Sequence, residues 1–213
     1  MHVTRFATCL MLGLVSTILC AQDAAPANSE LALDESFEAA ELGKGWNATT
    51  GSWTIANGVL RASEIESEKH SAATRRLLVT ENAVYQLRFR FVKTGESFHF
   101  GFDPARGELN KRGHLFSVIV TPDSWRIMKH VDKDRPTEDP NEILAEAKTE
   151  FAKDRWYTLR MTTWETHVTA TIEGKEPLKA SHRTFAASKP TLVFRCLGDG
   201  VEIDDIKVWK QVR

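Results

Sequence analysis

Carboxylates near the C-terminal end of the sequence have a spacing that could do chemistry. Glu202 and Asp204 stand two residues apart, so they share one face if this stretch is a β-strand. Retaining hydrolysis of a glycoside needs two carboxyl groups about 5–5.5 Å apart, one of them protonated. A further acid on this strand would fall at Ile206 or Lys207, which cannot serve. The sequence therefore argues against a catalytic carboxylate set here.

The same stretch fits a strand that contains a bulge. The apolar residues on either side of Asp204-Asp205 fall in opposite strand phases. They are Val201 and Ile203 before the pair, and Ile206 and Val208 after it. A bulge at the two aspartates would turn both apolar pairs towards one core.

The acids also suggest a calcium site. In sandwich folds the first and last strands often lie side by side, and the first predicted strand, 33–38, is rich in acids. Carboxylate oxygens are the ligands that Ca²⁺ prefers. The candidate ligands are Asp34, Glu35, Asp204 and Asp205. The alternative is that these acids are solvated or pair with nearby lysines, in which case no cofactor is needed.

A second set of polar residues is basic and opposes predicted core positions on alternating strands. Its members are Arg88, Arg90, His99, Arg160 and Arg195. If these strands are adjacent in one sheet, they form a cationic concave face, whose arginine forks suit the carboxylates or sulfates of an acidic glycan. Trp125, at a strand end, is a candidate to stack on a sugar ring. The alternatives are an ordinary solvated face and core packing of the tryptophan.

Other catalytic signals are missing from the sequence. We find no nucleotide-binding loop, no serine elbow and no zinc motif, and the histidines at 114, 130, 167 and 182 are scattered without metal-ligand spacing. Cys196 alternates with apolar neighbours, which is typical of a small buried side chain. The formal net charge of −1 gives no sign of the basic face that nucleic-acid binding needs.

The N-terminal residues indicate export. Residues 1–21 combine a short basic start at Arg5, an uncharged apolar run from Phe6 to Leu19, and Ala21 as a small residue for cleavage. The run is too short to cross about 30 Å of hydrocarbon as a helix. We predict a signal peptide cleaved near Ala21, a secreted or periplasmic protein and no transmembrane segment in the mature chain. Lipidation at Cys20 is the alternative, although Leu19 stands where a lipoprotein signal wants a small residue.

The remaining chain has strand periodicity. Residues 22–30 read as a flexible linker, and 31–213 as one domain of about ten short strands. Asn57-Gly58 between two alternating stretches is a strong hairpin signal. The predicted fold is all-β, an antiparallel two-sheet β-sandwich of the jelly-roll type. Residues 140–153 carry helix capping signals, but their place before Trp156 favours a strand.

The order of landmark residues resembles a known superfamily. These landmarks are Gly45-Trp46, Gly51-Ser-Trp53, Asn57-Gly58-Val-Leu60, Arg155-Trp156-Tyr157, Ile172-Glu-Gly174 and the terminal Ile203-Asp-Asp-Ile-Lys-Val208. Over roughly 31–213 the chain resembles the concanavalin A-like lectin/glucanase jelly rolls, and within them the laminin G-like and 3-keto-disaccharide hydrolase-like domains of secreted bacterial proteins. The hydrolase group's Asn-Ser-Gly-Ile segment, expected near 97–101, is absent, as is the Glu-bearing strand expected at 115–120.

These observations predict a secreted or periplasmic carbohydrate-binding module that has no catalytic machinery of its own. Its ligand, an acidic polysaccharide in the favoured case, would lie on the cationic face. Two alternatives remain open at this stage. One is a glycoside-cleaving enzyme of the 3-keto-disaccharide hydrolase type, which the resemblance implies. The other is a structural or adhesion domain that makes protein contacts through an outward apolar patch around Leu115 and Ile119, because the same fold hosts all three functions.

Overall fold

The structure is a computed structural model, and it describes residues 25–212. The predicted signal peptide, with Cys20, and the start of the predicted linker lie outside these residues. Within the described range, no helix has both the length and the apolar character needed to cross a membrane.

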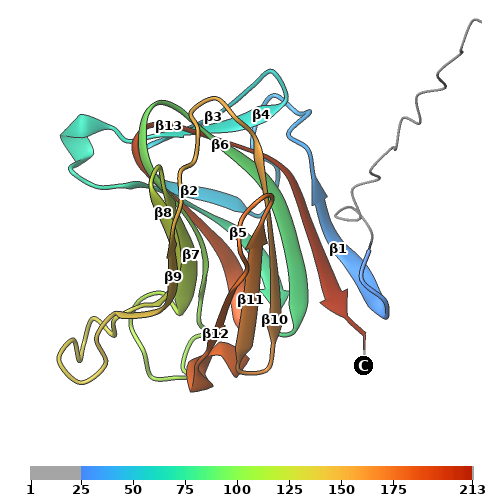
Figure 1. Ribbon diagram of the computed structural model, residues 1–213, viewed down its shortest axis with the longest axis vertical. Coiled ribbons are helices and arrows are strands. Elements are labelled where there is room, and N and C mark those ends of the chain that lie inside the picture. Colours follow the sequence, from blue (N-terminus) through green and yellow to red (C-terminus); the bar gives the residue numbers. More distant parts are fainter. Residues whose placement is uncertain (1–24, 213) are drawn as a thin grey trace, which may run out of the picture.

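Thirteen strands make up most of the described chain (Figure 1). They are β1 (Ser29–Glu35), β2 (Trp46–Thr50), β3 (Ser52–Ala56), β4 (Val59–Ser63), β5 (Ala72–Thr80), β6 (Ala83–Asp103), β7 (Phe116–Thr121), β8 (Ser124–Lys129), β9 (Glu142–Lys148), β10 (Tyr157–Trp164), β11 (His167–Ile172), β12 (Leu178–Ser181) and β13 (Lys189–Gln211). Two short 3₁₀ helices, η2 (Glu66–Glu68) and η3 (Arg183–Ala186), complete the described elements.

The two long strands β6 and β13 pair antiparallel over nearly their whole length and belong to both layers of the molecule. In the first layer, the first half of β6 and the second half of β13 are flanked by β10, β11 and β12 on one side and by β1, β4 and β3 on the other. In the second layer, the other halves are flanked by β7, β8 and β9, and by β5 and β2. The fold is thus an antiparallel two-layer sandwich, as predicted.

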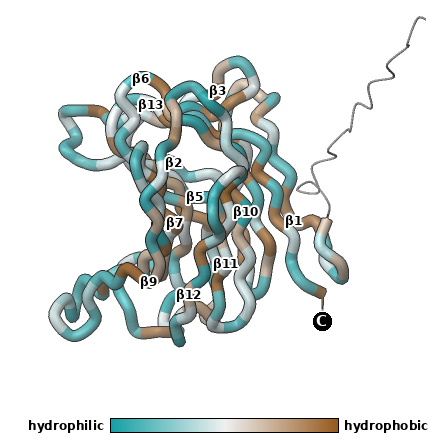
Figure 2. Tube along the Cα trace, in the orientation of Figure 1, coloured by the Kyte–Doolittle hydropathy of each residue, from teal (hydrophilic) through white to brown (hydrophobic). Residues whose placement is uncertain are grey.

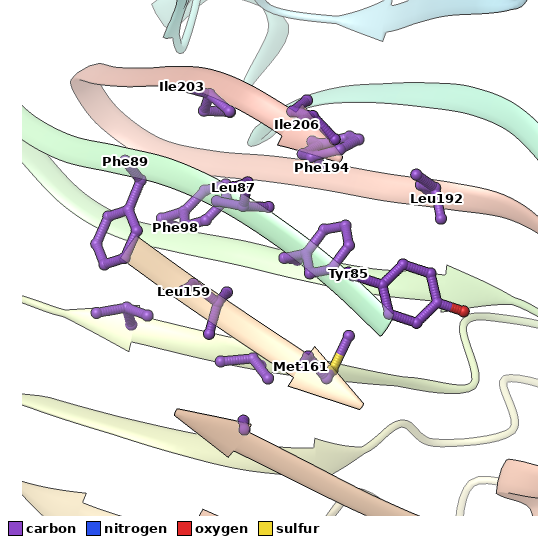
Figure 3. Packing of buried hydrophobic residues seen from close by; sticks show 14 of the residues in the cluster. Tyr85, Leu87, Phe89, Phe98, Leu159, Met161, Leu192, Phe194, Ile203 and Ile206 are labelled. Carbon is purple, nitrogen blue, oxygen red and sulfur yellow. The ribbon is translucent and has the colours of Figure 1, made fainter. Parts of the chain in front are cut away.

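The core lies between these layers. Phe89 and Phe98, from the two halves of β6, stack with ring centroids 5.3 Å apart (Figure 3). The ring centroids of Tyr85 and Phe102, also from the two halves, are 4.9 Å apart. Hydrophobic and hydrophilic residues alternate along the strands in Figure 2, as expected for strands with one buried face. Contacts between the two halves of one strand show that β6 folds back over itself to close the sandwich.

Glycines allow the paired long strands to bend together. Gly198 has φ +79°, and a Cβ on it would lie 2.3 Å from the carbonyl oxygen of Thr94. Gly200 has φ +111°, and its carbonyl oxygen would lie 2.4 Å from a Cβ added to Gly95. Both the left-handed backbone and the close approach exclude a side chain here.

Several details of the sequence prediction are confirmed. β3 and β4 form the predicted hairpin at Asn57-Gly58, and residues 142–148 are a strand. The bulge at Asp204-Asp205 is present, because the register of β13 against β6 shifts there and Asp205 has φ +49°. The strands are longer than the short ones predicted, since β13 runs without interruption from Lys189 to Gln211, and β1 begins at Ser29, inside the predicted linker.

We expect Gly198→Ala to lower the free energy of unfolding by about 2–4 kcal/mol, because it adds overpacking against Thr94 to the cost of a left-handed backbone. Gly174→Ala is the matched control, since Gly174 has φ +72° with nothing within 4 Å of an added Cβ. It should cost only about 1–2 kcal/mol. Chemical denaturation of both variants measures the difference, and equal losses would contradict the role given to the close approach.

Candidate functional site

The predicted cationic row is divided between two outer surfaces. Arg88 pairs with Thr158 and Asp204 in the first layer, whereas His99 pairs with Arg195 and Ile119 in the second. The prediction that all the basic residues share one face is therefore wrong. The bend of β6 and β13 carries His99 and Arg195 to one outer face, and leaves the rest of the row on the other: Arg88, Arg90 and Arg160.

The arginines of the first layer are occupied by acids or by other side chains. Arg90 and Arg61 both donate to the Glu202 carboxylate, which is 1% exposed. Arg88 donates to Asp205 at 2.9 Å, and Arg160 donates to Gln86. Burial would raise the pKa of Glu202, but hydrogen bonds from the two arginines outweigh burial and hold it below its ordinary value. Such a carboxylate is a structural ion-pair partner, consistent with the sequence argument against catalysis there.

The candidate calcium ligands are not gathered together. Glu35 accepts a hydrogen bond from the Trp46 indole, and Asp34 lies opposite Lys207 in the strand register. Asp204 and Asp205 both lie within ion-pair distance of Arg88. Among residues 25–212, no group of three or more His, Cys, Asp and Glu side chains is arranged to hold a metal ion.

Four further residues that the sequence singled out are all buried. Trp125 is 1% exposed within the core cluster, so the prediction that it could stack on a sugar is wrong. Leu115 and Ile119 are buried too, which removes the apolar patch proposed for protein contact. Cys196 is buried as predicted, and burial raises the pKa of its thiol to about 12.

The outer face of the second layer carries a cleft of about 460 Å³. Strands β2, β5, β6, β8 and β13 and the adjoining loops line it. The lining residues are Thr49, Thr50, His70, Ala73, Arg75, His99, Gly113, His114, Met128, His130, Val131, Lys133, Asn141 and Arg195. Four histidines and three strong bases thus converge, and the lining contains no carboxylate.

A carboxylate nevertheless lies against one of these histidines. Asp103, at the end of β6, contacts Nδ1 of His114 at 2.5 Å and accepts a hydrogen bond from Nε of Arg75 at 2.7 Å. Burial would raise the pKa of Asp103, but these partners outweigh it and bring the pKa to about 2. The carboxylate therefore stays ionised and can fix the orientation of the imidazole.

Two further histidines of the cleft are neutral. Burial, reinforced by nearby positive groups, lowers the pKa of His99 and of His130 to about 3. Nε2 of His130 lies 2.8 Å from the Ser117 hydroxyl, and Nε2 of His99 lies 3.1 Å from that of Ser97. Nδ1 of His99 is buried without a hydrogen-bond partner in the described structure. These imidazoles offer polar, uncharged ring atoms to the cleft.

Arg195 differs from the arginines of the other layer because its partner is neutral. Its Nε and Nη2 donate to the hydroxyl of Ser71 at 3.1 and 2.7 Å. Burial and the nearby Arg75 lower its pKa and outweigh the opposing effect of Glu64, which marks an incompletely compensated positive charge. No carboxylate within the described residues forms an ion pair with it. A bound anion would supply the missing charge.

Alternation in the sequence identified only part of this cleft. It singled out His99 and Arg195, but Arg75 lies in β5, which the sequence analysis did not recognise as a strand. His114 and His130 were set aside because their spacing matches no local motif. They meet only because β6, β7 and β8 are neighbours in the sheet, and their rings then lie 5.5 Å apart.

A larger cavity of about 630 Å³ lies elsewhere in the described part of the chain. Turn residues next to β5 and β10 line it together with the end of β13, and they include Asn82, Trp164 and Lys210. It lacks the histidines and arginines of the cleft, so the cleft is the better candidate site.

The neutral histidines predict a pH dependence of stability. Between pH 6.5 and about 3, the imidazoles of His99 and His130 are protonated in the unfolded chain but stay neutral in the folded protein. Stability should therefore fall as pH decreases through this range. His99→Asn should reduce this dependence, and His167→Asn, at an exposed position, should not. Denaturant midpoints measured across the range test this, and an unchanged slope in His99→Asn would contradict it.

No family model matches the sequence, and no curated protein matches it. Solved structures do match the fold. The laminarinase from Rhodothermus marinus superposes with a TM-score of 0.67 at 11% identity, over 87% of this chain and 98% of that one. A non-specific endo-β-1,3(4)-glucanase of family GH16 gives 0.65 at 10% identity, over 88% and 93%.

A carbohydrate-binding module also has this fold. The module CBM66 from Bacillus subtilis superposes with a TM-score of 0.54 at 12% identity, over 79% of this chain and 93% of the module. At such low sequence identities, these similarities establish the fold but not the function, which depends on the individual side chains. The chain has the concanavalin A-like jelly-roll fold.

Proposed function

We propose that this protein is an exported carbohydrate-binding sandwich whose ligand is an acidic glycan held in the cleft of the second layer. The observation that carries the proposal is Arg195, a partly buried guanidinium whose hydrogen bonds go to the neutral hydroxyl of Ser71. The predicted signal peptide and the glycan-related proteins that share the fold support export and a sugar ligand.

The charge of the cleft favours an anionic sugar. Arg75, Lys133 and Arg195 line it, and the lining offers no carboxylate to balance them. Asp103, behind the lining, compensates Arg75 through their hydrogen bond. A guanidinium fork matches the two oxygens of a carboxylate, so a uronate unit would satisfy Arg195 directly.

The other residues of the lining are better suited to hydrogen-bond to a sugar than to stack a ring on it. The imidazoles of the cleft, together with Thr49, Thr50 and Asn141, can donate to and accept from sugar hydroxyls. The lining contains no Trp, Tyr or Phe ring. Recognition would thus rest on polar contacts and charge, which again favours an acidic glycan over a neutral one.

Hydrolysis by two carboxylates has no support in the cleft. Such a mechanism needs one protonated carboxyl group and a second carboxyl group nearby. Asp103, the carboxylate that contacts the lining residues His114 and Arg75, is held ionised by them. The glycan-binding proposal therefore stands ahead of the alternative of a hydrolase of the 3-keto-disaccharide type.

We expect Arg195→Ala to weaken binding of an oligouronate by about 10- to 100-fold, the effect of losing a charge-assisted hydrogen-bond pair. Arg195→Lys should restore only part of the affinity, because it keeps the charge and loses the fork. Isothermal titration of the exported domain with oligomers of alginate and polygalacturonate measures both effects.

Arg88→Ala is the matched control, since it removes the same charge from the other outer face. It should leave binding within about twofold of wild type. If Arg88→Ala lost binding while Arg195→Ala bound normally, the binding site would lie on the first layer, and the proposed cleft would be wrong. Wild-type binding of neutral laminarin in preference to uronates would overturn the acidic-glycan proposal.

A further inference from the structure

The Asp103–His114 pair lies beside the proposed anion site and binding alone does not require it. Asp103 contacts Nδ1 of His114, and only that ring nitrogen has a hydrogen-bond partner among the described residues. A carboxylate on Nδ1 favours the tautomer whose Nε2 carries a lone pair. His114 also lines the cleft, so this imidazole lies at the surface where the glycan would sit.

The cleft therefore combines a carboxylate-oriented base with a guanidinium suited to a sugar carboxylate. His114 and Arg195 both line the same cavity of about 460 Å³. The C5 hydrogen of a uronate becomes more acidic when its adjacent carboxylate is neutralised by a cation. Two-carboxylate hydrolysis is unsupported here, but removal of this hydrogen needs only a base and a clamp.

We propose that the cleft cleaves uronate glycans by β-elimination, with His114 as the acid–base residue, Arg195 as the carboxylate clamp and Asp103 as the positioning residue for His114. The proposal rests on the proposed function, because it requires the uronate to bind in this cleft.

The reaction balances without any co-reactant. His114 takes the C5 proton, and the electrons of the C5–H bond form a double bond between C4 and C5. The bond from C4 to the glycosidic oxygen breaks, and its electron pair leaves with that oxygen. Where the C5–H and C4–O bonds lie on the same face of the ring, as in mannuronate, the imidazolium returns the proton to the oxygen. Where they lie on opposite faces, as in galacturonate, water donates the proton to the oxygen and the imidazolium releases its own proton to the resulting hydroxide. The products are one new reducing end and one unsaturated uronate conjugated with its carboxylate.

The remaining cleft residues fit these roles. Asp103 stabilises the imidazolium that forms at His114, as the buried carboxylate does in hydrolase triads. Arg75 donates to Asp103 and keeps it ionised. His99 and His130 stay neutral because burial lowers their pKa to about 3, so they add no positive charge that would oppose formation of the imidazolium.

The test incubates the exported domain with polygalacturonate and with alginate, and follows the ultraviolet absorbance of the conjugated product. Mass spectrometry of the products distinguishes elimination from hydrolysis, since hydrolysis adds one water. His114→Ala should lower turnover by about 10²–10⁴-fold, the usual contribution of a general acid–base residue, while uronate affinity stays within a few-fold of wild type. Added imidazole should restore part of the activity.

Two further variants define the roles. Asp103→Asn should lower kcat much more than it changes KM, because it orients the base and does not hold the sugar. His167→Ala, at an exposed position on β11, is the control and should have wild-type turnover. Circular dichroism spectra matching wild type show that each variant is folded.

The outcomes separate the two proposals. Uronate binding in the cleft without any unsaturated product from wild type would overturn the elimination and leave the binding function intact. Unsaturated product formed equally by wild type and His114→Ala would overturn the role of His114. Absence of uronate binding would overturn the proposed function and this reaction together.

Discussion

The pairing of β6 with β13 is the interaction on which the rest of this molecule depends. The two strands remain hydrogen-bonded from one layer into the other, so a single ladder positions both sheets. Each strand contributes core residues to both sides of the sandwich, and aromatic rings from the two halves of β6 meet in the middle. The bend at Gly95, Gly198 and Gly200 decides which residues face one another, and therefore where any site can form.

The same bend separates two kinds of arginine. On the first layer, Arg61 and Arg90 converge on Glu202, whose burial would be costly without them. These charges satisfy one another and serve the fold. On the second layer, Arg195 is left with a hydroxyl partner. An incompletely compensated charge in a cleft is more informative about function than a larger number of paired charges.

Proteins of similar fold show that the architecture alone does not determine the function. A laminarinase, an endo-glucanase and a carbohydrate-binding module share this sandwich with the present chain at identities near 10%. The chain places imidazoles and guanidiniums along the cleft of its second layer, and the carboxylate of Asp103 is bound there to Arg75 and His114. The chemistry open to this protein follows from those side chains.

The sequence by itself determined that the chain is mainly β-strand, the sandwich class and local features such as the Asn57-Gly58 hairpin and the bulge at Asp204-Asp205. These depend on alternation and turn chemistry within a few residues. Only the tertiary structure decided that Arg88 and His99, on one strand, face different surfaces, and that Asp103, His114 and Arg195 share a cleft. A strand's alternation tells which residues leave the core, but the bend of a long strand and the order of its neighbours decide where they emerge.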